Sequence, residues 1–71
     1  MKKGDLVRAL GTLALWTDDG AKMKAAEEVT DGQLLMFVGR GKYKFVRVLH
    51  PVFGIRQIHG HHVKAVSNEG G

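Results

Sequence analysis

Residues 34–66 constrain the fold of this chain more than any other part of it. They contain three short apolar runs, a one-turn break and a fourth apolar run, separated by glycine, proline and polar residues. Short apolar runs between turn residues are typical of β-strands. In a chain of 71 residues, this order predicts an all-β fold, a very small closed β-barrel. Such a barrel has no room for a buried active site, so we expect the protein to act with its surface or by assembling with copies of itself.

The length predicts a single domain, residues 1–67, followed by a flexible polar C-terminal tail at residues 68–71. The chain has no cysteine, so disulfides cannot supplement a small core, and the composition fits a reducing compartment. Its longest strongly apolar run, residues 34–38, is far shorter than the roughly 20 residues of a membrane span. The charged N-terminus does not resemble a signal peptide. We therefore expect a cytoplasmic protein with no membrane partner.

Glycine and proline divide the chain into five expected strands. An apolar run at residues 12–16 follows Gly11 and either extends the first strand past a bulge or begins a long hairpin loop. Residues 21–28 are rich in helix formers, which predicts a short helix or an ordered loop there. Residues 34–38 lack polar alternation, which predicts a strand covered on both faces. The expected strands are residues 5–10, 33–39, 42–50, 55–59 and 63–66, with a single turn at residues 60–62.

The charge is uneven along the chain. Residues 1–32 carry a net charge of −1 and residues 33–71 a net charge of +5, with all four histidines in the second part. A basic sheet region attracts polyanions or phosphorylated ligands. Alternatively, these cations form a solvated surface that protects strand edges from aggregation. The candidate ligand-binding residues are Lys44, Arg47, Arg56, Gln57 and His59.

The same basic region suggests weak nucleic-acid binding as an alternative function. Phosphates are bound by cations and single-stranded bases stack on aromatic rings, and Tyr43 and Phe45 lie among the cations. The cations concerned are Lys42, Lys44, Arg47, Arg56 and Lys64.

Three clustered histidines, His59, His61 and His62, are the candidate metal ligands. A closed zinc site needs four ligands, and one chain offers these three histidines without cysteine. Neighbouring residues in a turn point apart, so the alternative is that the histidines pack over the barrel end or cap backbone groups. We therefore predict neither a metal site nor a cofactor in the single chain.

Large apolar residues exceed what a five-stranded barrel encloses. Trp16, Met36, Phe37 and Phe53 belong either to the core or to an interface. Exposed apolar patches usually mark association, so we expect a homo-oligomer, a dimer or a tetramer, with another protein as the alternative partner. No cysteine nucleophile, phosphate-binding glycine loop or Ser-His-Asp pattern is present, which argues against an enzyme.

The pattern of five short strands, a long first loop and a one-turn segment before the last strand resembles SH3-like barrels. The opening Lys3-Gly4-Asp5-Leu6-Val7-Arg8 is similar to that of many small uncharacterised phage and bacterial proteins of this type. A fold does not imply a function. The resemblance fits a non-enzymatic binding or assembly module and is compatible with a phage origin.

A second resemblance is to the plasmid-type (type II) dihydrofolate reductases, which are tetramers of SH3-like barrels around a pore. Gly4-Asp5-Leu6-Val7-Arg8 matches their Gly-Asp-Arg-Val-Arg, and Gln57-Ile58-His59 resembles their Gln-Ile-Tyr. This resemblance implies a pore lined by Gln57 and His59 that binds NADPH and dihydrofolate. The chain departs from the pattern at Ala9, Arg56 and His59, so the pore enzyme stands as an alternative.

Overall fold

The computed structural model describes residues 2–19 and 22–66 and shows an all-β protein, as predicted. Seven strands and one short 3₁₀ helix follow one another along the chain, where five strands were expected. The elements are β1 (Leu6–Ala9), β2 (Leu13–Asp19), β3 (Lys22–Val29), β4 (Leu34–Arg40), β5 (Phe45–His50), β6 (Gly54–His59), η1 (Gly60–His62) and β7 (Val63–Ala65).

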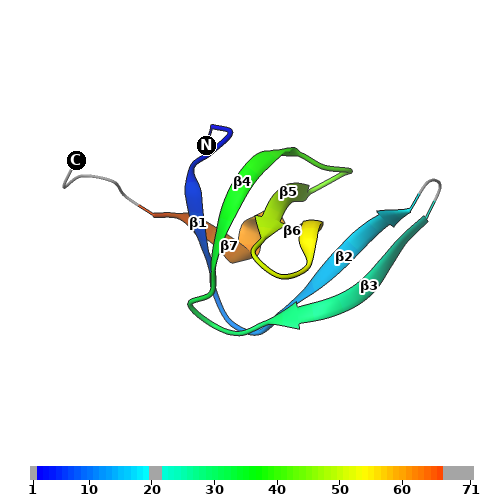
Figure 1. Cartoon of the computed structure of the whole chain (residues 1–71), viewed down its shortest axis with the longest axis horizontal. Helices are drawn as coiled ribbons and strands as arrows, with labels where there is room; N and C mark the ends of the chain where they lie inside the picture. The colour runs from blue at the N-terminus through cyan, green and yellow to red at the C-terminus, as the bar shows by residue number, and fades with distance from the viewer. Residues whose placement is uncertain (1, 20–21, 67–71) are drawn as a thin grey trace.

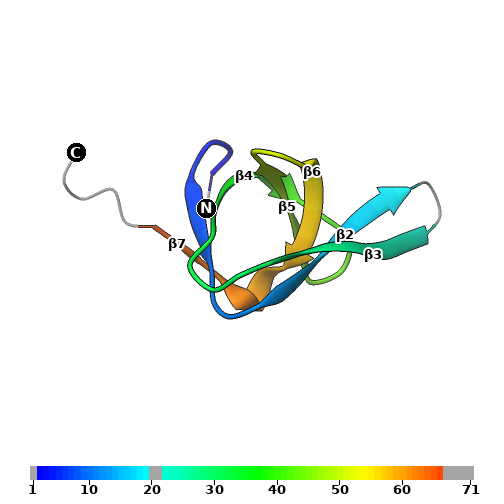
Figure 2. The same cartoon turned by 60° about the horizontal axis from the view of Figure 1, so that its bottom comes forward.

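The strands form one antiparallel sheet in the order β3-β2-β6-β5-β4-β1-β7. The sheet curls strongly, and the hairpin of β2 and β3 projects from the curled body (Figure 1; Figure 2). β3 and β7 form the two ends of the strand order, and the described residues show no pairing between them. The sheet is therefore open, whereas the sequence predicts a closed barrel.

The helix or ordered loop predicted near residues 21–28 is wrong over the described part of that range. Lys22–Val29 is strand β3, paired with β2 from Leu13↔Val29 to Asp19↔Lys22. A helix of eight residues is unstable alone, whereas pairing with β2 satisfies the backbone of this segment, so tertiary structure overrides helix propensity. Residue 21 and the tail predicted at residues 68–71 lie outside the described residues.

The apolar run after Gly11 belongs to β2, which forms a hairpin with β3 and does not extend the first strand. Gly11 has a φ of +99°, which turns the chain between β1 and β2. The register of β2 on β3 shifts between Leu15, which pairs with Glu27, and Trp16, which pairs with Ala25. β2 meets the rest of the sheet through the pairing of Trp16 with Gln57 on β6.

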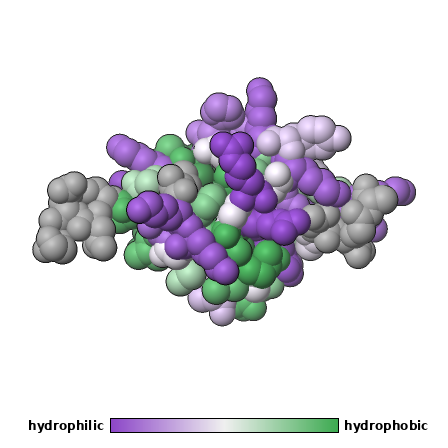
Figure 3. All heavy atoms as spheres, turned by 90° about the horizontal axis from the view of Figure 1, so that it is seen from above, coloured by the Kyte–Doolittle hydropathy of each residue, from purple (hydrophilic) through white to green (hydrophobic). Residues whose placement is uncertain are grey.

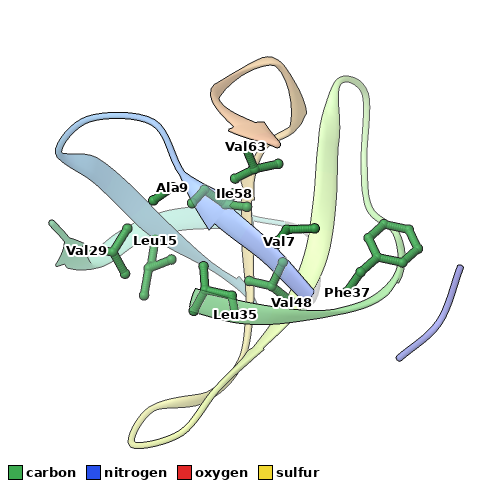
Figure 4. Packing of buried hydrophobic residues seen from close by; sticks show 9 residues of the cluster. All are labelled: Val7, Ala9, Leu15, Val29, Leu35, Phe37, Val48, Ile58 and Val63. Carbon is green, nitrogen blue, oxygen red and sulfur yellow. The ribbon is translucent and has the colours of Figure 1, made fainter. Parts of the chain in front are cut away.

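Every strand contributes to one hydrophobic core. Figure 4 shows the buried side chains converging on the interior of the curled sheet. Because the chain has so few core residues, local hydrogen bonds weigh heavily in its stability. The buried apolar residues are Val7, Ala9, Leu15, Val29, Leu35, Phe37, Val48, Ile58 and Val63.

Strand β4 does not have two covered faces, so that prediction is wrong for the single chain. Leu35 and Phe37 are buried, whereas Leu34 is 47% exposed and Met36 40% exposed. The side chains alternate between the core and the outer face, as in a sheet with one packed face. The apolar residues of the outer face are described below.

The 3₁₀ helix occupies Gly60–His62, as predicted. The N–H of Gly60 donates to the backbone oxygen of Lys44 at 2.9 Å, which fixes η1 against the turn between β4 and β5. A Cβ at residue 60 would lie 2.9 Å from that same oxygen, so glycine allows this close approach. In residues 2–19 and 22–66, no helix has the length and apolar character needed to cross a membrane.

Candidate functional site

The five candidate ligand-binding residues do not gather in one place. Three of them share the outer face of the sheet. Arg47 is paired with Gln57, and His59 lies two residues beyond Gln57 on the same strand. Arg56, between Gln57 and Ile55, points to the opposite face. Lys44 lies in the turn before β5. The five residues are therefore divided between the two faces of the sheet and the adjoining turn, with Arg56 on the face away from Arg47, Gln57 and His59.

Gln57 is a structural residue. Its side chain is 1% exposed, and its Oε1 accepts a hydrogen bond from the backbone N–H of Lys42 at 3.0 Å. Gly41 packs so closely on this amide that a Cβ there would overlap Oε1. The turn between β4 and β5 thus covers Gln57, whereas the resemblance to the pore enzymes implies that it lines a surface.

Arg56 is engaged by an acidic partner. Its Nε lies 2.8 Å from Glu27 Oε1, its Nη2 lies 3.4 Å from Oε2, and its Nη1 donates to the backbone oxygen of Ile55 at 2.8 Å. The hydrogen bond from Arg56 lowers the pKa of Glu27 below 4.5, against desolvation, which raises it. This two-pronged contact ties β6 to β3.

The rings of the three clustered histidines lie close together at tilted angles, with His59 in contact with each of the other two. The ring centroid of His59 lies 5.4 Å from that of His61 and 5.0 Å from that of His62. The Nδ1 of His59 accepts a hydrogen bond from the backbone N–H of His61 at 3.4 Å, so His59 is the N-cap of η1. Among the described residues, no group of three or more potential ligands is placed to hold a metal ion.

Burial holds the pKa of His59 below its ordinary value of 6.5. Desolvation is the largest cause, and the charges of His62, His61 and Lys44 add to it. His59 also contacts Phe45 edge-on, with a centroid distance of 5.6 Å, and Phe45 meets Trp16 at 5.8 Å. These aromatic contacts place His59 in a packed cluster on the outer face rather than at a solvated ligand position.

A hollow of the described surface, the basic pocket, lies between the β4–β5 turn and η1. It has a volume of about 480 Å³. Arg40, Lys44 and His61 supply positive or protonatable groups, and no acidic residue lines it. Lys44 is the only one of the five ligand-binding candidates that lines this pocket. His61 is the only one of the three candidate metal ligands that does so. The lining residues are Phe37, Arg40, Tyr43, Lys44, Phe45, Val46, Gly60 and His61.

A second feature, the apolar row, crosses the outer face of the sheet. Leu6 pairs with Met36, Met36 pairs with Leu49, and Leu49 pairs with Ile55. Val66 extends the row, since its N–H donates to the backbone oxygen of Leu6 at 2.9 Å. These five side chains are between 37% and 50% exposed. Leu6, Met36 and Leu49 of the row, together with Leu34, Leu35 and Pro51, line a shallow hollow of about 250 Å³.

Apolar side chains thus remain in contact with water in the single chain. Figure 3 shows one face of the molecule on which hydrophobic side chains gather next to strongly hydrophilic ones. An apolar row that crosses four strands (β1, β4, β5 and β6) and reaches the residue after β7 is continuous, unlike single surface leucines. The sequence indicated that β4 has more large apolar residues than the core needs. It did not indicate which residues of the neighbouring strands lie beside them in the row.

No protein-family model, curated protein or solved structure matches this chain. Function is therefore inferred from the geometry of the chain itself.

Proposed function

We propose that this protein is a non-enzymatic assembly module that associates with a second copy of itself through the apolar row. The observation that carries the proposal is the exposure of Leu6, Met36 and Leu49, which are direct cross-strand neighbours on the uncovered face. Contiguous apolar patches on small domains mark association sites. A chain of this size also gains stability when a partner covers such a face.

The row is suited to pairing with itself. A two-fold axis that runs along β4, between two facing sheets, exchanges the strands on either side of β4. Leu6 of one copy then lies over Leu49 of the other, Val66 over Ile55, and Met36 over Met36, according to the register of the strands. Because the outer face of the curled sheet is convex (Figure 1), the closest contacts form near the axis, where Met36, Leu6 and Leu49 meet apolar side chains of the second copy.

The charges on this face do not oppose the pairing. Arg8 lies one row to one side, opposite Leu34, and the same axis places it over the position of Pro51 in the second copy. Arg47 lies one row to the other side, opposite Gly39, and is carried over the segment just before β1 in the second copy. Arg8 and Arg47 of one copy are thus kept apart from Arg8 and Arg47 of the other, which suits an isologous interface.

The test is light scattering over a range of protein concentrations, with a matched pair of leucine variants. Leu6 is the first residue of β1 and Leu10 directly follows the strand; both are 45% exposed, and only Leu6 belongs to the row. We expect a dimer for the wild type and for Leu10→Glu, and a monomer for Leu6→Glu, because a carboxylate in the row is desolvated on pairing.

Two results would contradict the proposal. One is a monomer of wild-type protein at every concentration. The other is equal loss of the dimer in Leu6→Glu and Leu10→Glu, since it would place the interface elsewhere. Met36→Glu, in the centre of the row, provides an independent variant that is expected to behave like Leu6→Glu.

A further inference from the structure

The basic pocket combines a cationic rim with an apolar floor. Arg40, Lys44 and His61 lie at its rim, and Phe37 and Val46, which belong to the core or pack against it, form its floor. Cations that only protect strand edges from aggregation would need no apolar hollow beneath them, so this alternative does not explain the floor of the pocket. Ligand pockets of a few hundred Å³ with apolar walls and a few polar groups are typical of small-molecule sites.

Tyr43 is held at the rim with its ring in solvent. It is 91% exposed and has a φ of +53°, the only positive φ outside glycine among the described residues. A bulky residue in this backbone region is uncommon and costs energy, so such positions cluster at binding sites. An exposed aromatic ring beside cations has the chemistry to stack on a planar base.

The frame of the basic pocket is fixed by backbone hydrogen bonds. Gly41 N–H donates to Phe45 O at 3.0 Å, Phe45 N–H donates to Lys42 O at 2.8 Å, and Gly60 N–H donates to Lys44 O at 2.9 Å. The amide of Gln57 holds Lys42 from below. The turn that carries the cations is therefore preorganised, which lowers the entropic cost of binding.

We propose that the basic pocket binds a nucleoside phosphate, with the phosphate at Arg40 and Lys44 and the base against the ring of Tyr43. Arginine and lysine are the side chains that bind phosphate oxygens. The apolar floor and the exposed ring favour a phosphate that carries a base over inorganic phosphate. This site is separate from the apolar row and does not depend on the proposed self-association.

The ligand has two sources, a free nucleotide or one unit of a single strand, and the experiment separates them. Amide resonances of the ¹⁵N-labelled full chain are followed during titration with thymidine monophosphate, with a thymidine strand of about eight nucleotides, and with inorganic phosphate. We expect shifts at Gly41, Phe45 and Gly60, whose N–H groups frame the pocket, with either nucleotide probe. Tighter binding of the strand assigns it as the source, and equal or tighter binding of the mononucleotide assigns the free nucleotide.

Three variants assign the parts of the site. Lys44→Ala removes a phosphate contact while its backbone oxygen still holds Gly60, and we expect about tenfold weaker binding. Tyr43→Asn removes the ring but keeps a residue that tolerates the positive φ, and we expect a loss of preference for nucleotide over inorganic phosphate. Lys64→Ala, an exposed cation on β7 outside the pocket, is the control with the same charge change.

The result that would overturn the assignment is an absence of shifts at Gly41, Phe45 and Gly60 with both nucleotide probes. Equal weakening by Lys64→Ala and Lys44→Ala would also overturn it, because binding would then follow net charge alone. If inorganic phosphate binds as tightly as thymidine monophosphate, the base makes no contact and the nucleoside assignment is wrong. Amide spectra of each unliganded variant verify that the fold is retained.

Discussion

The side-chain oxygen of Gln57 accepts a hydrogen bond from the backbone N–H of Lys42 and lies directly under Gly41. The amide therefore supports the β4–β5 turn from the outer face of the sheet. Its Nε2 is buried, with no hydrogen-bond partner in the part of the chain that the structure describes. A buried donor without a partner costs on the order of 1–3 kcal/mol, so the support that Oε1 gives the turn offsets a real penalty.

This contact predicts strong coupling between residues 41 and 57. Gly41→Ala should destabilise the protein by about 2 kcal/mol, because the new Cβ overlaps Gln57 Oε1. Gln57→Ala should cost about 2 kcal/mol through the lost hydrogen bond and the cavity. In the double variant the overlap is relieved. Its loss of stability should therefore be smaller, by at least about 1 kcal/mol, than the sum of the losses in the two single variants. Chemical denaturation of the four proteins measures this cycle, and strictly additive losses would contradict the contact.

The Arg56–Glu27 pair predicts a pH-dependent contribution to stability. The pKa of Glu27 is lowered in the folded protein by the hydrogen bond from Arg56. Its contribution is therefore fully present above the ordinary value of 4.5 and is lost as the pH falls through the lower pKa of the folded state. Glu27→Gln should be less stable than wild type at neutral pH, and the difference should shrink in acid.

Glu28, the exposed neighbour of Glu27 on β3, supplies the control. Glu28→Gln removes the same charge without touching Arg56, so its difference from wild type should vary less with pH. Urea unfolding at several pH values compares the three proteins. If the difference in the free energy of unfolding between wild type and Glu27→Gln does not change with pH, the ion pair contributes nothing to folding.

The second half of the fold could be predicted because its signals are local. Residues 42–50 contain β5, Pro51 follows its last residue, and η1 occupies the predicted turn before β7. β3 could not be predicted in this way. Its Ala, Lys and Glu residues favour a helix, and only pairing with β2, which lies in a different run, makes it a strand.

The site residues show the same limit. Arg56 and Gln57 are adjacent, and strand alternation correctly separates their side chains. No local signal shows that Glu27, 29 residues away, binds Arg56, or that the turn covers Gln57. The place of Arg40 beside Lys44 and His61 depends on how η1 docks on the β4–β5 turn, which no local signal shows.

His50 has a structural role at the end of β5. It is 8% exposed, and its Nδ1 accepts hydrogen bonds from the backbone N–H groups of Val52 and Phe53 at 3.0 and 3.2 Å. The ring also stacks on Phe53, with a centroid distance of 4.4 Å. His50→Ala should destabilise the protein by about 2 kcal/mol, because both donors of the turn lose their acceptor.

Asparagine at residue 50 separates these two roles. Its Oδ1 takes the place of Nδ1 as the acceptor but supplies no ring, so His50→Asn should lose about half as much stability as His50→Ala. Thermal unfolding of both variants provides the comparison. Equal losses would show that the stacking on Phe53, and not the capping of the turn, is what His50 contributes.

His59 predicts a second pH dependence, with a different window. Its pKa in the folded protein is below 6.5, mainly because of desolvation. The unfolded chain therefore takes up the proton first as the pH falls, so this contribution to stability is present above 6.5 and is lost between 6.5 and the lower folded pKa.

Titration of the imidazole resonances by NMR should show a midpoint below 6.5 for His59. In His62→Asn the midpoint should rise, since a neighbouring charge is removed, yet remain below 6.5, since burial is the larger cause. Lys24→Ala, on the projecting hairpin, is the control and should leave the midpoint unchanged. A wild-type midpoint at or above 6.5 would mean that the ring is solvated, and it would contradict the packing of His59 against Phe45.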